Sequence, residues 1–114
     1  EFLGGLEVDD LIKLYQKCGL FVFPSTVETF GNPLVEAMAC GAPIASSNAA
    51  AMPEVLGDAG LYFDPNKISD MRDTILKLML DKELRNLISE LAEARSQEFS
   101  WEKTEAKTKL VFQV

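Results

Sequence analysis

Hydrophobic residues recur at helical spacing in several stretches of the chain. The first covers residues 8–18, with Asp9 as the predicted N-cap. Two more follow beyond residue 65 and are separated by a predicted cap near Asp81. A last helix is predicted for residues 101–112. The hydrophobic faces of the two middle helices contain Ile68, Met71, Ile75 and Leu78, and then Leu84, Leu87, Ile88 and Leu91.

Short apolar runs predict three strands, at residues 20–23, 44–46 and 61–63. The first run is apolar without alternation, which is typical of a strand covered on both faces in a parallel sheet. A predicted helix at residues 33–40 follows it, and a single helical turn at residues 53–56 follows the second strand. Strands that alternate with helices predict a right-handed parallel α/β fold, here continued by a helical tail.

The segment from Pro24 to Gly41 contains the residues that could carry chemistry. It joins the carboxyl end of the first strand to the next helix, and ligands of open α/β sheets bind at that edge. Free backbone N–H groups at the helix start can bind a phosphate. Gly31 would allow the backbone to approach a ligand closely, although it could equally serve the turn alone.

Glu36 is the only charged residue of the predicted helix, whose other residues are apolar on all sides and predict burial. Side chains tilt toward the N-terminus of a helix, so the carboxylate is expected to lean toward the mouth of the site. A buried carboxylate needs hydrogen-bond donors, and two vicinal sugar hydroxyls are suitable ones. Alternatively, Glu36 only complements the helix dipole in the first turn.

Glu28 lies in the loop, eight positions before Glu36, so both carboxylates could point into one cleft. Such a pair could bind the two ends of an extended ligand, or act as acid and base. The alternative for Glu28 is a solvated loop residue. Residues 46–48, Ser-Ser-Asn, follow the second strand at the same edge and either line the site or form a polar turn.

Composition excludes several classes of function. The formal charge of −7 and the pI of about 4.5 argue against nucleic acid as a partner. The chain has no histidine, so a Ser-His or Cys-His nucleophile is excluded. Cys18 and Cys40 are expected to be buried free thiols in a reducing compartment. No apolar run approaches the roughly 20 residues of a transmembrane segment and no signal peptide is present, so a cytoplasmic location is expected.

Residues 28–36, Glu-Thr-Phe-Gly-Asn-Pro-Leu-Val-Glu, match the Glu-x7-Glu motif of retaining glycosyltransferases that have two facing Rossmann-like domains. The chain resembles glycosyltransferase family 4, also called glycosyl transferases group 1, and the resemblance covers nearly its whole length. Further motifs occur in the expected order, namely Phe23-Pro24-Ser25, Glu36-Ala-Met-Ala-Cys-Gly41-Ala-Pro43, Pro53-Glu54-Val-Leu-Gly57-Asp-Ala-Gly60 and Phe99-Ser-Trp101-Glu102.

The resemblance implies that residues 1–114 are a single, incomplete C-terminal domain with a partial Rossmann-like sheet, of the type called GT-B. Glu28 would be the catalytic residue beside the transferred sugar, and Glu36 would hold the ribose hydroxyls of a nucleotide diphosphate sugar. The other donor-binding residues would contribute backbone groups. Those of Phe30, Gly31 and Asn32 would contact the sugar hydroxyls, and the amides of Leu34 and Val35 would face the diphosphate.

The family needs no metal and no cofactor beyond its nucleotide sugar substrate, and the chain has no Asp-x-Asp sequence of the metal-dependent kind. Fixed donors aimed at the departing phosphate would lower the barrier. The family's basic diphosphate ligands have no match here, because Lys13 and Lys17 lie on an earlier helix. The diphosphate is therefore expected to bind poorly.

The resemblance also implies partners. The N-terminal domain that holds the acceptor is absent, so the chain alone is expected to be inactive. An unpaired sheet edge is expected to favour dimers or larger species. In the whole protein, a peripheral position at a membrane is compatible with a cytoplasmic location. Two alternatives remain open, a stand-alone binding or interaction module derived from such a domain and a fragment of a sugar-nucleotide epimerase, although the ordered motifs argue against the epimerase.

Overall fold

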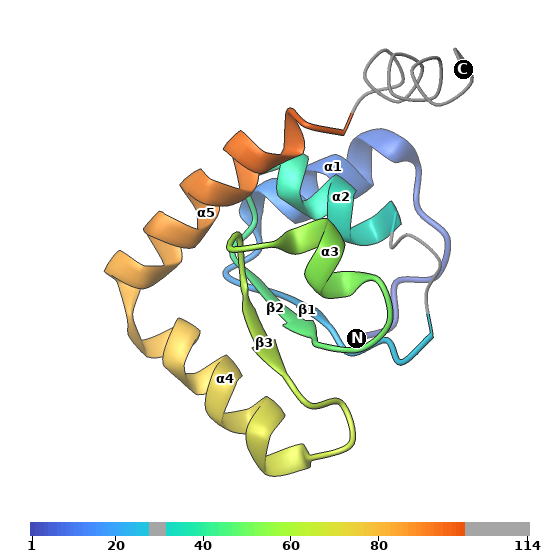
Figure 1. The fold of residues 1–114 in the computed structure, drawn as a ribbon. Coiled ribbons are helices and arrows are strands. Elements are labelled where there is room, and N and C mark those ends of the chain that lie inside the picture. The colour runs from blue at the N-terminus through green and yellow to red at the C-terminus, as the bar shows by residue number, and fades with distance from the viewer. Residues whose placement is uncertain (28–31, 100–114) are drawn as a thin grey trace, which may run out of the picture.

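The computed structural model describes residues 1–27 and 32–99. The sequence predictions for Glu28, Phe30, Gly31 and the helix at residues 101–112 lie outside this part of the chain. Three parallel strands form a sheet in the order β1-β2-β3 (Figure 1). The strands are β1 (Phe21–Phe23), β2 (Ile44–Ser47) and β3 (Leu61–Phe63).

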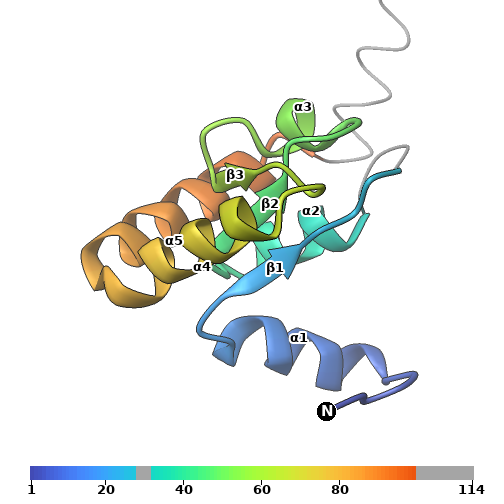
Figure 2. The ribbon, with the colours of Figure 1, turned by 90° about the horizontal axis from the view of Figure 1, so that it is seen from below.

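Helices cover both faces of the sheet (Figures 1 and 2), and in Figure 1 α4 lies far from α1 and α2. None of the helices in the described part of the chain has the length and apolar character needed to cross a membrane. The helices are α1 (Val8–Lys17), α2 (Asn32–Ala39), α3 (Met52–Leu56), α4 (Ile68–Leu80) and α5 (Lys82–Ser96).

Two clusters of buried side chains form the core, one on each face of the sheet. On one face, Leu34 and Met38 of α2 pack with Ile44 of β2 and with residues of α1 and α3. On the other face, Phe63 of β3 packs with residues of α4 and α5. Helix α5 takes part in both clusters, with Ala92 in the first and Ile88 in the second. The alternation of strands and helices therefore produces the predicted α/β layers.

Local signals at two helix ends are confirmed. The N–H of Leu84 donates to the Asp81 carboxylate at 2.9 Å, so Asp81 caps α5 as predicted. Helix α2 stops before Gly41, which has a φ of +73°. Backbone N–H groups of Gly41 and Ala42 donate back to Met38 and Ala37 at 3.1 and 3.0 Å, which closes the helix in a Schellman motif.

Two other sequence predictions are wrong. Helix α1 has Glu7 at its N-cap, so Asp9 lies inside the first turn. Ile68, at the first position of α4, is 85% exposed and does not belong to the core face. Strand β1 is half-buried, with Phe21 and Phe23 packed against the core cluster on one face of the sheet and Val22 against the cluster on the other, which agrees with the predicted cover on both faces.

Candidate functional site

The segment from Pro24 to Gly41 begins directly after the carboxyl end of β1 and contains α2, whose first turn starts at Asn32. Leu34 is fully buried and Val35 half-buried, so their side chains anchor the first turn of α2 while Asn32 stays exposed. Amides in the first turn of a helix have no acceptor inside that helix. Pro33 has no N–H, so the donors of this turn are those of Asn32, Leu34 and Val35. These backbone groups suit an anion.

Glu36 is exposed, so the prediction of a buried carboxylate is wrong. Helix α2 is not buried all round, since Asn32, Glu36 and Ala39 form an exposed strip at i, i+4 and i+7. The first turn of α2 contains no acidic residue, which removes the alternative that Glu36 complements the helix dipole there. The carboxylate is instead available to a ligand without the cost of burying a charge.

Tyr15 of α1 contacts this carboxylate from the neighbouring helix. Its hydroxyl donates a hydrogen bond to Glu36 Oε2 at 3.2 Å. The side chain is only 8% exposed, and its ring packs edge-to-face on Phe21 of β1 with the centroids 5.3 Å apart. Burial, followed by the charge of Glu36, raises the pKa of Tyr15 to about 12. The phenol therefore stays protonated and remains a donor at neutral pH.

An apolar pocket of about 300 Å³ lies between α1 and α2 beside this pair. Among the described residues that line it, Glu36 is the only acidic or basic one. Burial, followed by the Glu36 charge, raises the pKa of the Cys40 thiol, so the thiol is neutral as well. The pocket thus combines apolar walls with one carboxylate. Its lining residues are Val8, Leu11, Ile12, Tyr15, Glu36, Ala39 and Cys40.

Of the predicted polar residues, Ser46 and Ser47 are the last two residues of β2, and only Asn48 follows the strand. Ser46 and Ser47 are fully buried, and the Ser46 hydroxyl donates to the Ser47 carbonyl at 3.0 Å. The Ser47 hydroxyl accepts the N–H of Ala49, also at 3.0 Å. Both hydroxyls thus form hydrogen bonds with backbone groups of residues 47–49, whereas the Asn48 side chain is exposed. Ala50 in the same loop has a φ of +52°, a backbone conformation that costs a residue with a Cβ about 1–2 kcal/mol.

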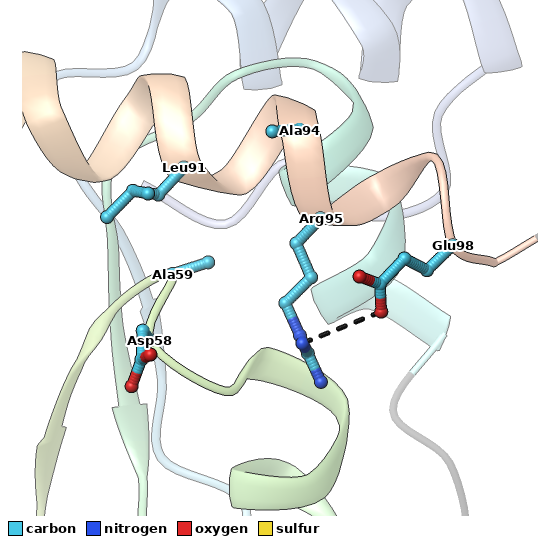
Figure 3. Close-up of a pocket in the computed structure, with 6 residues that line it drawn as sticks. All are labelled: Asp58, Ala59, Leu91, Ala94, Arg95 and Glu98. Atoms are coloured by element: carbon cyan, nitrogen blue, oxygen red, sulfur yellow. Dashed lines mark ion pairs between the residues drawn. The ribbon is translucent and has the colours of Figure 1, made fainter.

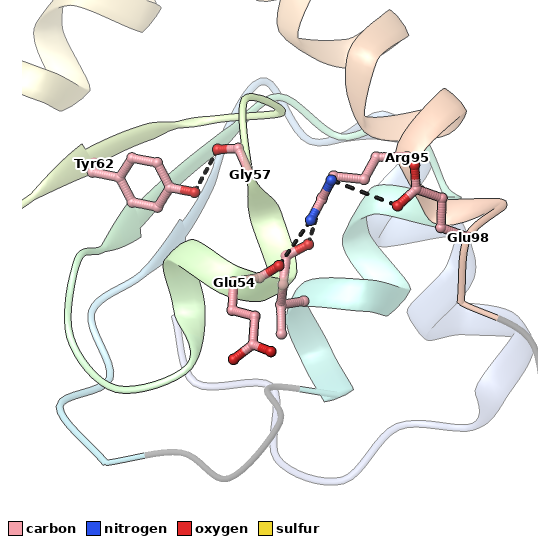
Figure 4. Close-up of polar contacts among 6 residues, drawn as sticks. Glu54, Gly57, Tyr62, Arg95 and Glu98 are labelled. Atoms are coloured by element: carbon pink, nitrogen blue, oxygen red, sulfur yellow. Dashed lines mark hydrogen bonds and ion pairs between the residues drawn. The ribbon is translucent and has the colours of Figure 1, made fainter. Parts of the chain in front are cut away.

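Arg95 of α5 holds the end of α3. Its Nε and Nη2 donate to the carbonyl oxygens of Val55 and Glu54, at 2.7 and 2.8 Å (Figure 4). It also forms an ion pair with Glu98 at 3.6 Å. Figure 3 shows its side chain crossing a second pocket, of about 240 Å³. The guanidinium is therefore occupied with protein groups, and Arg95 does not replace the missing diphosphate ligands.

Sequence reasoning missed both Tyr15 and Arg95. A tyrosine on the apolar face of a helix signals a buried phenol that needs a polar partner, but it does not identify the partner. Arg95 lies in a helix with many charged residues, and no sequence signal distinguishes it from its neighbours. In the described ranges, 1–27 and 32–99, no group of three His, Cys, Asp or Glu residues could hold a metal ion.

Comparison with known proteins extends this geometry. The sequence model of the family "Glycosyl transferases group 1" matches residues 1–95. The chain belongs to this family. The resemblance stated from the Glu-x7-Glu segment is thereby confirmed, and neither the stand-alone module nor the epimerase is favoured.

Two relatives of this glycosyl transferases group 1 chain are mannosyltransferases by name. "O-antigen chain mannosyltransferase B" of Escherichia coli is 40% identical over 107 residues, which are 94% of this chain and 28% of the relative. "Serotype-specific mannosyltransferase WbdA" of Escherichia coli is 44% identical over 103 residues, which are 90% of this chain and 13% of the relative. The chain therefore spans less than a third of the length of these relatives.

A solved structure confirms the fold of the group 1 chain. Sucrose-phosphate synthase from Thermosynechococcus elongatus matches with a TM-score of 0.86 at 24% sequence identity. The match covers 99% of this chain and 29% of the synthase chain. The predicted fold class, a parallel α/β sheet with flanking helices from a GT-B type protein, is confirmed.

Proposed function

We propose that the chain is the donor-binding part of a glycosyltransferase that transfers a hexose from a nucleotide diphosphate sugar to an acceptor. The observation that carries the proposal is the Glu36 carboxylate at the edge of an apolar pocket, in a chain of the glycosyl transferases group 1 family. A carboxylate accepts two hydrogen bonds, as a ribose diol requires. The apolar walls between α1 and α2 suit the flat face of a nucleobase.

The proposal assigns the other groups by their place in the fold. The amides of Leu34 and Val35 in the first turn of α2 would bind the diphosphate. Backbone groups of Asn32, Gly31 and Phe30 would contact the sugar hydroxyls, and Glu28 would be the catalytic residue beside the sugar. Because the two relatives are named mannosyltransferases, a mannosyl group is the first sugar to test.

The reaction we propose retains the configuration of the sugar and needs no metal or further cofactor. Donors at the helix start would stabilise the charge that develops on the departing diphosphate. Transfer would also need an acceptor-binding domain, so the isolated chain would bind its donor weakly and be inactive. The whole protein would act in the cytoplasm, free or peripherally at a membrane.

Nucleotide binding to the chain tests the proposal. Uridine, guanosine and adenosine diphosphates would be titrated in turn, each beside its 2′,3′-dideoxy counterpart, with ¹H–¹⁵N NMR spectra as the readout. We expect weak binding of at least one ribonucleotide, with shift changes in α1 and α2. Binding of none of the three, or shift changes confined to other elements, would contradict a nucleoside site here.

Glu36→Gln then tests the carboxylate itself. This change keeps the size of the side chain but removes the charge and one acceptor. Since hydrogen bonds to charged groups contribute about 1.5–3 kcal/mol, affinity for the ribonucleotide should fall about 10- to 100-fold. Affinity for the dideoxynucleotide should hardly change. Glu83→Gln, at an exposed position in the first turn of α5, removes the same charge away from the pocket and should leave both affinities unchanged.

A further inference from the structure

The contact between Tyr15 and Glu36 joins residues 21 positions apart, on two helices. Tyr15 is nine-tenths buried, whereas the carboxylate that it meets is exposed. A free glutamate side chain at a helix surface samples several rotamers, and fixing such a side chain costs up to about 2 kcal/mol of entropy. A rigid donor beside the carboxylate reduces the number of rotamers before a ligand arrives.

The tyrosine ring is well held. It packs edge-to-face on Phe21, and Phe21 stacks on Phe23 with centroids 6.0 Å apart. Both phenylalanines belong to β1, so the phenol is braced directly against the sheet. The hydroxyl therefore has a fixed position relative to α2, and only the hydroxyl hydrogen needs to rotate.

The hydrogen bond engages one oxygen of the carboxylate. Oε2 accepts from Tyr15, at a distance that is long for an O–H···O bond. Each carboxylate oxygen has two acceptor sites, so Oε1 and the second site of Oε2 remain for a vicinal diol. Tyr15 also lines the apolar pocket, so the hydroxyl lies where the pocket meets the carboxylate.

We propose that Tyr15 is a positioning residue, which orients the Glu36 carboxylate so that its remaining acceptor sites face the diol of a nucleoside in the pocket between α1 and α2. The proposal rests on the proposed function, because it takes Glu36 as the ribose ligand. Tyr15 acts through Glu36 and not on the reacting atoms. It raises affinity by ordering the free protein, as preorganised sites generally do.

Tyr15→Phe tests the proposal, since it keeps the ring in the core and removes only the hydroxyl. Affinity for the diphosphate that binds best among those of uridine, guanosine and adenosine should fall about three- to tenfold, as expected for loss of one hydrogen bond. Affinity for its 2′,3′-dideoxy counterpart should not change. An equal loss for both nucleotides would indicate a purely structural role and would overturn the proposal.

Tyr62→Phe is the matched control. The Tyr62 hydroxyl donates to the Gly57 carbonyl at 2.6 Å, and neither residue is among the described residues that line the pocket beside Glu36. This variant loses a comparable tyrosine hydroxyl and should bind both nucleotides like the original chain. In a Glu36→Ala background, Tyr15→Phe should cause no additional loss, because the carboxylate that it orients is gone.

Side-chain NMR couplings provide a readout without any ligand. Glu36 should favour one rotamer in the original chain and become averaged in Tyr15→Phe, and unchanged couplings would count against positioning. The two proposals fail separately. If Glu36→Gln lowers the affinities for the ribonucleotide and the dideoxynucleotide equally, or lowers neither, the proposed function fails. If Glu36→Gln lowers only the affinity for the ribonucleotide, but Tyr15→Phe binds both nucleotides like the original chain, only the proposed role of Tyr15 fails.

Discussion

Tyr15 and Tyr62 are the only two tyrosines in the sequence, and each donates its hydroxyl to a group on another part of the chain. Burial raises the pKa of both phenols to about 12, with Glu36 adding to the effect at Tyr15 and Asp58 at Tyr62. At Tyr62 the positive charge of Arg95 acts in the opposite direction. At the scale of single residues, burial and hydrogen bonding thus keep both side chains neutral.

A spectrophotometric titration at 295 nm should therefore show no tyrosinate near pH 10 in the folded chain. Both phenols should ionise near pH 12, whereas in urea they should ionise near the ordinary value of about 10. Because the folded pKa values are raised, the stability they contribute is complete below pH 10 and is lost as the pH rises toward 12. A folded-state transition near pH 10 would contradict the packing of at least one tyrosine.

Helix α3 shows what holds a short element in place. It has five residues, too few for a helix to be stable alone. Pro53 lies in its first turn, and the guanidinium of Arg95 binds the carbonyls of Glu54 and Val55 from outside. Helix α5 thus fixes α3, and with it the loop that contains the left-handed Ala50. The side chain of Arg95, distant in sequence, thus stabilises a helix that the residues of α3 could not stabilise by themselves.

Arg95→Ala should destabilise the chain by about 2 kcal/mol, since it removes charged donors from two carbonyl groups. Urea unfolding monitored by circular dichroism would measure this loss. Arg72→Ala is the control, because Arg72 forms only an exposed ion pair with Asp73 at 3.0 Å, and such pairs contribute little. Equal midpoints for the two variants would show that Arg95 does not hold α3.

The whole molecule has two sheet edges that no described residue pairs with, one along β3 and one along β1. The N–H of Phe21 donates to the Pro43 carbonyl at 2.8 Å, on the side of β2. Backbone groups alternate along a strand, so the N–H of Val22 points to the other side. Unpaired groups of this kind are a template for another strand.

The chain should therefore form dimers or larger species at high concentration in sedimentation velocity experiments. Val22→Pro removes the N–H that points away from β2 and leaves the hydrogen bonds between β1 and β2 in place. This variant should shift the distribution toward monomer. A chain that sediments strictly as a monomer at every concentration would show that the β1 edge does not associate.

The order of strands and helices was predictable because it depends on local signals. Asp81 is an N-cap followed by a hydrophobic repeat, and Gly41 supplies the positive φ that ends α2. Both act within a few residues of their position. The exposure of Ile68 could not be predicted, because hydrophobic periodicity identifies the apolar face of a helix but does not show whether another element packs against the end of that face.

The candidate site was predictable only in part. The sequence indicated Glu36 and the start of α2, but composition alone suggested burial. Exposure of Glu36 depends on how α1 lies along α2, with small residues such as Ala39 and Cys40 between them. The partner of Glu36 is Tyr15, and a pairing across two helices leaves no mark in local sequence. Long-range side-chain geometry was the part that required a structure.

Helix α5 contributes Ile88 to the core on one face of the sheet and Ala92 to the core on the other. These residues are four positions apart, about one turn of the helix. Detachment of this single turn would admit water to both sides at once. The two layers consequently belong to one cooperative unit. Backbone amides on both sides of the sheet should exchange their hydrogens with solvent through the same opening of α5.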